Sequence, residues 1–359
     1  MVIVRSLRRN SNIELLRILC ILSIIAHHYV VNSGLMDKMA ENPTSFPTFF
    51  YYMFGMWGKT GINCFLLITG YYMCCSKIKL TKWLRYYFEI IFYNLCIGLV
   101  FVLLGKEQFS LLFLIKKLFF IRLVKDDFVS CFMWFYLFIP FLNMFVSSMN
   151  KKTHMFFIIL LLFMYCVVGS FPNSINMNYV EWFCVIYLIA SFLRLYPPPA
   201  SLRWGAMAIV SIVLSVVSVV ILALFNIDIW FPYLFVCEPN KIMSVIVSVC
   251  LFMFFKDFHL PYNKYINLVA SSVFGVLLIH ANSNAMRQWL WQEIVRCADH
   301  YMAPNYILYS IGCVFLIFLS CVVIDQLRKA TIEKWWIKFI EKRFSKTVSD
   351  TKLHSYVQI

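Results

Sequence analysis

The first long apolar segment of the chain, residues 12–32, contains side chains that lipid disfavours, namely Glu14, Arg17, His27 and His28. A titratable group inside a bilayer is costly, which makes each one a candidate for function. At about 100° per residue, Arg17 and His28 lie only ~20° apart around a helix, and Glu14 lies ~40° from His28. His27 points about 100° away from this stripe. Because a neutral imidazole can accept a proton from a hydroxyl group, we predict His28 as a catalytic base in one polar track with Arg17 and Glu14.

A second histidine, His280, ends another apolar segment that begins near Tyr265. Its position, at ~1.5 Å per residue, places His280 near the outer face of the bilayer. The same rise places His28 ~16 Å beyond Arg17 along its own helix, at a similar depth. The two histidines are therefore predicted to meet at one outer cavity. The alternative is that Glu14 and Arg17 reach back to the inner headgroups and the histidines lie in the outer headgroup layer.

Composition determines the fold class that can position these residues. Of 359 residues, 62% are hydrophobic and only 14% are charged, whereas globular proteins are about 45–50% apolar. A soluble fold is excluded, and an all-α polytopic membrane protein is predicted, with about ten transmembrane helices of about 20 residues. The expected spans are 12–32, 57–75, 85–105, 131–149, 154–170, 178–196, 204–225, 232–255, 264–282 and 305–325.

The charge distribution indicates an orientation. The net charge is +15, but the cations gather in alternate loops, as in membrane proteins with positive inner loops, and no nucleic-acid partner is expected. Both termini are predicted to be cytoplasmic, with a transmembrane domain over 1–330 and a basic cytoplasmic tail over 331–359. Residues 106–127 break the pattern, and their segment 111–120 is expected to lie along the outer interface. The inner cations are Arg5, Arg8, Arg9, Lys77, Lys79, Lys82, Arg85, Lys151, Lys152, Arg194 and Arg203.

Four separated motifs point to a known family. Arg17 and His28 are separated by ten residues in the first span. Residues 63–71 read Asn-Cys-Phe-Leu-Leu-Ile-Thr-Gly-Tyr, residues 134–143 read Trp-Phe-Tyr-Leu-Phe-Ile-Pro-Phe-Leu-Asn, and residues 274–280 end in Leu-Ile-His. In this order the motifs resemble those of membrane-bound acyltransferase family 3, whose members O-acylate bacterial surface polysaccharides.

The resemblance implies a coenzyme A thioester as acyl donor, bound at the cytoplasmic rim. Where the family has Arg-x-x-Arg after its second span, this chain has Lys82-x-x-Arg85, so charge is kept while half of the bidentate geometry is lost. We predict Lys79, Lys82 and Arg85 as donor-binding residues. The alternatives are that these cations only set the topology and that Arg85 forms an i,i+4 ion pair with Glu89.

The predicted function is a membrane O-acyltransferase, in the simplest case an O-acetyltransferase of the cell (inner) membrane. It would move an acyl group from cytoplasmic acetyl-CoA to a hydroxyl of a surface polysaccharide or lipid-linked glycan. The protein is also expected to contact membrane lipid. His28 would act as a base or as a transient acyl carrier, and His280 would orient the acceptor or an intermediate.

Two rival hypotheses stay open. In a polysaccharide or lipid-linked sugar transporter the same polar track would be a permeation path, and a scaffold protein would tolerate its loss. Phosphate loops, nucleophile elbows and metal-ligand spacings are absent from the sequence, and no metal is expected. Weaker candidates for an acceptor cleft are Lys59, Glu181, Glu238 and Lys241.

Overall fold

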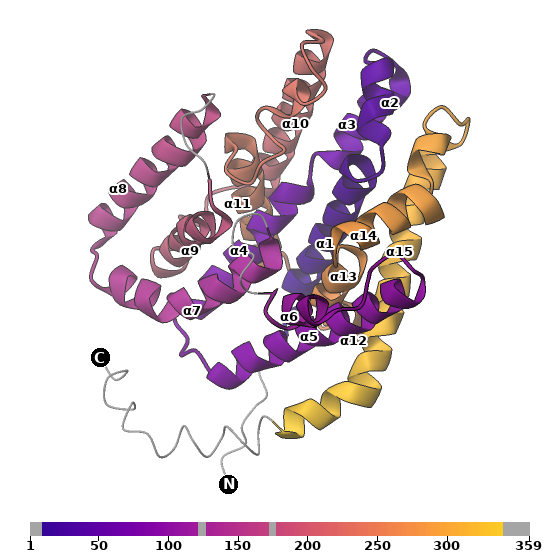
Figure 1. The fold of residues 1–359 in the computed structure, drawn as a ribbon. Helices are drawn as coiled ribbons and strands as arrows, with labels where there is room; N and C mark the ends of the chain where they lie inside the picture. The colour runs from indigo at the N-terminus through magenta and orange to yellow at the C-terminus, as the bar shows by residue number, and fades with distance from the viewer. Residues whose placement is uncertain (1–8, 121–126, 172–176, 340–359) are drawn as a thin grey trace.

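The computed structural model describes residues 9–120, 127–171 and 177–339, and every regular element in these ranges is helical (Figure 1). The longer helices are α1 (Ser11–Val31), α4 (Gly58–Met73), α5 (Leu80–Leu103), α7 (Phe128–Ser147), α8 (Lys151–Leu162), α9 (Tyr179–Leu195), α10 (Trp204–Leu224), α11 (Ile242–Asp257) and α15 (Tyr306–Arg328). The shorter helices are α2 (Leu35–Glu41), α3 (Phe46–Gly55), α6 (Leu111–Leu118), α12 (Lys264–Ala270), α13 (Val273–His280) and α14 (Asn284–Gln288).

Six helical segments of the described chain are long and apolar enough to cross a membrane, and a bent pair brings the number up to seven. The all-α membrane class is therefore confirmed. Each of the ten expected spans contains a helix, but α4, α9 and α11 have only 16, 17 and 16 residues, less than the ~20 that a straight crossing needs. Ten spans and cytoplasmic termini stay predictions. The six segments are Ser11–Val31, Leu80–Leu103, Phe128–Ser147, Lys151–Ser170, Trp204–Leu224 and Tyr306–Phe339.

One predicted helix start differs from the structure. The helix expected over 232–255 begins only at Ile242, because Pro232 and Pro239 interrupt the chain before it, and proline cannot continue a helical hydrogen-bond ladder. Helical structure runs on from Tyr306 to Phe339, and the division into a transmembrane domain over 1–330 and a cytoplasmic tail stays a prediction. The expectations for Arg5, Arg8 and residues 340–359 lie outside the described residues.

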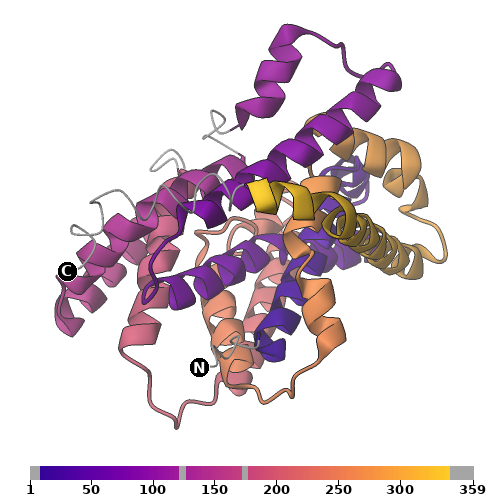
Figure 2. The same ribbon diagram turned by 90° about the horizontal axis from the view of Figure 1, so that it is seen from below.

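Helix α1 is the element around which the others pack. Within its most apolar window 61% is buried inside the protein, against 22% for α5 and 28% for α10. It contacts α3, α4, α11, α12, α13 and α15. Figures 1 and 2 show α7, α8 and α9 on one side of α1 and the yellow helix α15 on the other. A span shielded from lipid can carry polar side chains toward protein, which explains how α1 tolerates its charged residues.

The outer helices present apolar side chains outward. On α10, large aliphatic residues are more than half exposed although the helix is the most hydrophobic of the candidate spans. A soluble protein rarely leaves such a continuous apolar surface uncovered, so this surface is suited to lipid. The exposed residues on α10 include Ile209, Val210, Val213, Leu214 and Leu224.

The segment expected at the outer interface forms the short helix α6, which packs against α5. Ser110 caps it by accepting a hydrogen bond from the Phe113 amide. Leu111 and Ile115 are exposed, while Lys116 and Lys117 line an internal cavity. Helix α6 therefore presents exposed apolar residues outward, while its two lysines lie along the cavity.

A cysteine in place of Lys79 should be protected from a membrane-impermeant maleimide in intact cells and react after permeabilisation, because positive loops stay in the cytoplasm. Lys79 is exposed in the structure, so burial would not account for protection. The test uses a Cys75→Ser, Cys96→Ser background, which removes the exposed native thiols. Lys38→Cys, on α2 beyond the other end of α1, is the control expected to react from outside. Labelling of the Lys79→Cys protein from outside would reverse the orientation.

Candidate active site

One large cavity runs along α1. Its volume is about 1850 Å³, well above the ~300–1,000 Å³ of a typical small-molecule site. Side chains of α1 line it from Glu14 and Arg17 near the start of the helix to His28 near its end, and α4, α5, α6, α7 and α13 supply further walls. The polar track predicted along α1 thus faces an open space that has room for more than one small ligand.

His28 and His280 meet at this cavity. The Nδ1 atom of His28 lies 3.1 Å from Nε2 of His280, and Nδ1 of His280 lies 2.6 Å from the carbonyl oxygen of Val276. Because a carbonyl can only accept, His280 donates from Nδ1, and its Nε2 accepts a hydrogen bond from His28. His28 therefore keeps the lone pair of Nε2 available to take a proton. His28 lines the cavity, whereas His280 is fully buried behind it.

The chain direction changes sharply where His280 lies. The helical segments Lys264–His280 and Asn284–His300 form an angle of 95°. Ser283 starts the second segment by accepting a hydrogen bond from the Met286 amide. The bend places His280 at the last turn of its helix, beside the end of α1, rather than in the middle of a straight span.

Close packing against α15 holds the helix that carries His280. A Cβ atom on Gly275 of α13 would overlap the carboxylate of Asp325 on α15. That carboxylate is fully buried and lies 2.9 Å from Arg328 and 2.8 Å from Lys329. Tyr93 of α5 donates a further hydrogen bond to it at 2.8 Å. This buried ion network fixes α13 between α5 and α15.

His27 also lines the cavity, which the helical angle alone did not predict. Its Nδ1 lies 2.8 Å from the carbonyl oxygen of Gly55, so it donates to the last residue of α3. Gly58 of α4 packs so closely that a Cβ there would overlap the His27 side chain. The cavity wraps around more than one face of α1, but only His28 hydrogen-bonds to His280.

At the start of α1 the cavity has a positively charged end, called here the basic rim and formed by Arg9, Arg17, Lys82 and Arg85. Glu14 Oε2 lies 3.9 Å from both Arg9 Nη1 and Arg17 Nε, too far for a hydrogen bond. Lys82 is near enough to Arg9 and Arg17 for their charges to interact. The basic rim therefore combines four cations with one buried carboxylate, an arrangement that favours polyanions.

The structure brings only some of the predicted donor-binding residues to the cavity. Lys82 and Arg85 line it, whereas Lys79 is exposed just before α5 begins and is not part of the wall. Glu89, the alternative partner considered for Arg85, forms an ion pair with Arg328 at 2.9 Å. The position of α15, which the local sequence around residue 85 does not reveal, decides this pairing.

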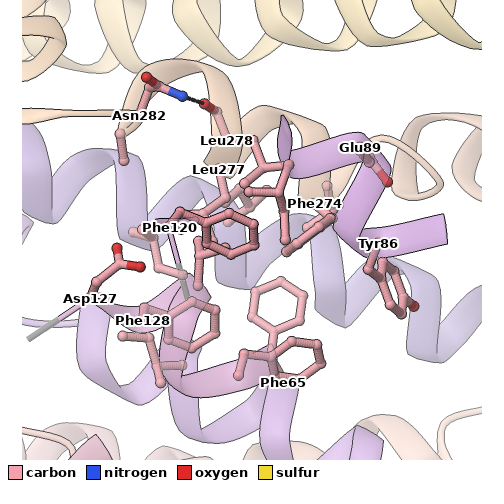
Figure 3. A pocket seen from close by; sticks show the side chains of 18 of the residues that line it. Phe65, Tyr86, Glu89, Phe120, Asp127, Phe128, Phe274, Leu277, Leu278 and Asn282 are labelled. Carbon is pink, nitrogen blue, oxygen red and sulfur yellow. Dashed lines mark hydrogen bonds between the residues drawn. The ribbon is translucent and has the colours of Figure 1, made fainter. Parts of the chain in front are cut away.

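Between Arg17 and His28, the α1 residues Ile21 and Ile24 give the cavity an apolar wall. Figure 3 shows rings that line the same cavity, called here the aromatic waist: Phe65, Phe120, Phe128 and Phe274. These rings come from four separate parts of the chain. Tyr86 and Glu89 lie to one side of them, and Asp127 and Asn282 lie to the other. A charged group bound at either end would therefore be separated from the other end by an apolar stretch.

Sequence reasoning missed several polar residues around the His28 end of the cavity, namely Asp127, Tyr179, Asn282 and Arg287. The sequence contains an indication of Arg287, because polar residues follow directly after the apolar segment that ends at His280. The other three stand at helix ends, where polar caps are ordinary. Their shared position depends on how distant helices meet.

The weaker candidates divide in the same way. Lys59 lines the cavity, whereas Glu181, Glu238 and Lys241 do not. Glu181 instead accepts a hydrogen bond from Tyr165 at 3.0 Å. Within the described parts of the chain, no group of three or more His, Cys, Asp or Glu side chains is arranged to hold a metal ion.

Replacing Gly275 by alanine should lower the melting temperature of the protein, because the new methyl group has no space beside the buried carboxylate of Asp325. Overpacking of this kind costs about 1–3 kcal/mol. Gly312→Ala in α15 is the matched control, since a Cβ there meets nothing within 4 Å. Equal melting temperatures for the two variants in detergent would show that α13 and α15 are not in close contact.

Comparison with known proteins identifies one family. A family model described as an acyltransferase domain matches residues 10–326, from the start of α1 into α15. No curated protein and no solved structure matches the chain. The matched region contains Arg17, His28 and His280 and nearly all of the apolar helices. The chain therefore belongs to acyltransferase family 3 and is a membrane acyltransferase.

Proposed function

We propose that the protein is an O-acetyltransferase of the cell (inner) membrane, which moves an acetyl group from cytoplasmic acetyl-CoA to a hydroxyl of a surface polysaccharide or lipid-linked glycan. The observation that carries this proposal is the hydrogen bond between His28 and His280 in a cavity whose far end is the basic rim. A base at one end and anion-binding cations at the other suit a hydroxyl acceptor and a polyphosphate-bearing donor.

His28 would act as the general base. As the acceptor hydroxyl oxygen attacks the acyl carbonyl carbon, the hydroxyl proton moves to Nε2 of His28, and the carbon–sulfur bond breaks. His280 accepts the hydrogen bond from Nδ1 of His28 and so holds the ring in the tautomer that leaves Nε2 basic. The proton on Nε2 then passes to the departing sulfur, which returns His28 to its neutral state.

The basic rim fits the phosphates of the donor. Arg17 Nε has no hydrogen-bond partner, although it is buried at the cavity wall, and Lys82 and Arg85 line the same wall. When bound, the donor supplies an acyl group activated as a thioester. Glu14 would orient the guanidinium groups of Arg9 and Arg17, from which it lies 3.9 Å.

The distance between the rim and the base suits a long donor. Arg17 and His28 lie ~16 Å apart along the axis of α1, and the apolar residues Ile21 and Ile24 line the cavity between them. An extended, uncharged arm could cross the apolar stretch while the phosphates stay among the cations. This arrangement would let a cytoplasmic donor serve an acceptor at the opposite face.

His28→Ala should reduce acetyl transfer to the glycan by about 10²–10⁴-fold, the usual contribution of a general base. His280→Ala should have a smaller effect, and His280→Gln should recover part of it, since an amide oxygen can accept from His28 Nδ1. His27→Asn is the control, because its amide can still donate to Gly55. Acetylation is measured by mass spectrometry of surface glycan and with purified protein and acetyl-CoA.

A different order of activities among the histidine variants would change which residue is assigned as the base. Active His28→Ala protein together with inactive His27→Asn protein would move the base to His27. Unchanged glycan acetylation in all the histidine variants would remove histidine catalysis. Sugar movement into vesicles without any transfer from acetyl-CoA would support a transporter instead.

Replacing Lys82 and Arg85 together by alanine should weaken acetyl-CoA binding about tenfold or more, because each charge-assisted contact to phosphate contributes roughly 1.5–3 kcal/mol. The maximal rate at saturating donor should fall less, since these residues act in binding. Lys77→Ala, an exposed cation outside the cavity, is the matched control. Unchanged donor affinity in the double variant, measured by titration, would leave these residues as topology determinants.

A further inference from the structure

Two cationic side chains lie close to His28, far from the basic rim. Lys59 of α4 and Arg287 of α14 both line the cavity, and both are near enough to His28 for their charges to act on its ring. Tyr179, at the start of α9, accepts a hydrogen bond from Lys59 and interacts electrostatically with Arg287. Three helices that are distant in the sequence thus converge on one polar corner, called here the outer cationic site: Lys59, Tyr179 and Arg287.

The hydrogen bonds of these residues leave capacity for a ligand. Lys59 Nζ donates to the Tyr179 hydroxyl at 2.7 Å, so the hydroxyl proton of Tyr179 is directed elsewhere. Arg287 donates from Nη1 to Asn284 at 3.1 Å and from Nη2 to the Ala281 carbonyl at 3.4 Å. Its Nε atom is buried and has no hydrogen-bond partner. A buried guanidinium N–H without an acceptor is costly, which favours an acceptor supplied by a ligand.

The nearby carboxylates do not form ion pairs with the outer cationic site. In the described parts of the chain, neither Lys59 nor Arg287 forms an ion pair. Asp127 interacts electrostatically with Arg287 and lines the cavity, and its Oδ2 accepts hydrogen bonds from the Ser130 amide and hydroxyl. Glu238 interacts electrostatically with Lys59 but is exposed outside the cavity wall.

We infer that the outer cationic site binds a permanent negative charge on the acceptor glycan, a carboxylate or a phosphodiester close to the hydroxyl that is acylated. This inference rests on the proposed function, because it assumes that the acceptor reacts at His28. Both anions present oxygen acceptors that a guanidinium, an ammonium and a phenolic hydroxyl can bind together. The acceptor would thereby be oriented with its hydroxyl toward Nε2 of His28.

Stabilisation of the transition state alone would need less charge than the site contains. The oxygen of the attacked carbonyl carries at most one transient negative charge, whereas Lys59 and Arg287 are cationic at all times. Two cations without an ion-pair partner in a partly buried wall are poorly solvated. An anion that is present in the bound ground state relieves this cost, and its effect falls on acceptor affinity rather than on the maximal rate.

The test compares methyl glucuronide and methyl glucose 6-phosphate with neutral methyl glucoside, using the full-length protein in detergent. Binding is followed by saturation-transfer NMR without donor, and acetyl transfer is followed with acetyl-CoA. The wild-type protein should prefer at least one anionic sugar about tenfold or more, the value of one charge-assisted hydrogen bond. Whether the carboxylate or the phosphate ester binds more tightly identifies the anion.

Variants assign that preference to the site. Lys59→Met with Arg287→Gln should bring the ratio of anionic to neutral binding close to one, while Lys59→Arg and Arg287→Lys should keep most of it. Arg296→Gln, which removes a cation outside the cavity, should leave the ratio unchanged. A variant that does not fold is recognised by its melting temperature. In that case the binding ratios of the Lys59→Arg and Arg287→Lys variants test the inference.

Several outcomes would overturn the inference. Equal binding of neutral and anionic sugars by the wild type would do so, whether or not acetyl is transferred. A loss of maximal rate on all sugars with the binding preference intact would assign Lys59 and Arg287 to the transition state instead. If the preference is found but nothing is acetylated, the anion site stands and the proposed acetyl transfer fails.

Discussion

The hydrogen bond between His28 and His280 joins two residues 252 positions apart and connects the most buried of the six candidate spans with the end of a bent helical segment. In lipid, a polar side chain needs an internal partner, because water is absent to replace it. An imidazole on α1 without a hydrogen-bond partner would cost desolvation free energy and add nothing to stability. Paired with His280, and through it with the Val276 carbonyl, the ring has a defined tautomer and faces the cavity with a basic nitrogen.

This pairing depends on packing at some distance from the cavity. Helix α13 can reach α1 only because Gly275 leaves space for Asp325, whose carboxylate is held by Arg328, Lys329 and Tyr93. Removing one partner from such a buried network typically costs about 3–5 kcal/mol, since an uncompensated charge is left behind. Glu89 of α5 joins the same network through its ion pair with Arg328.

Charged side chains of the cavity wall lie at two separate depths. Cations gather at the basic rim and again at the outer cationic site, with apolar Ile21 and Ile24 of α1 between them. Charges separated by low-dielectric walls are screened far less than charges at a surface, so each end can hold its own anion. A donor with its phosphates at the basic rim and an acidic acceptor at the outer cationic site would meet at His28. Such a division of charge suits transfer between ligands that enter from opposite faces.

Much of this protein follows from the sequence by itself. Lipid as solvent demands long apolar helices, and the helical period places Arg17, Glu14 and His28 on one stripe, because both depend only on local composition and spacing. The partners of these residues were decided by the tertiary structure. Three features depend on how helices distant in the sequence pack. His27 donates to Gly55, Lys79 lies outside the cavity, and Arg287 is near enough to His28 for its charge to act on the ring. Such contacts are set by shape and close approach, which a linear pattern of apolar and charged residues does not encode.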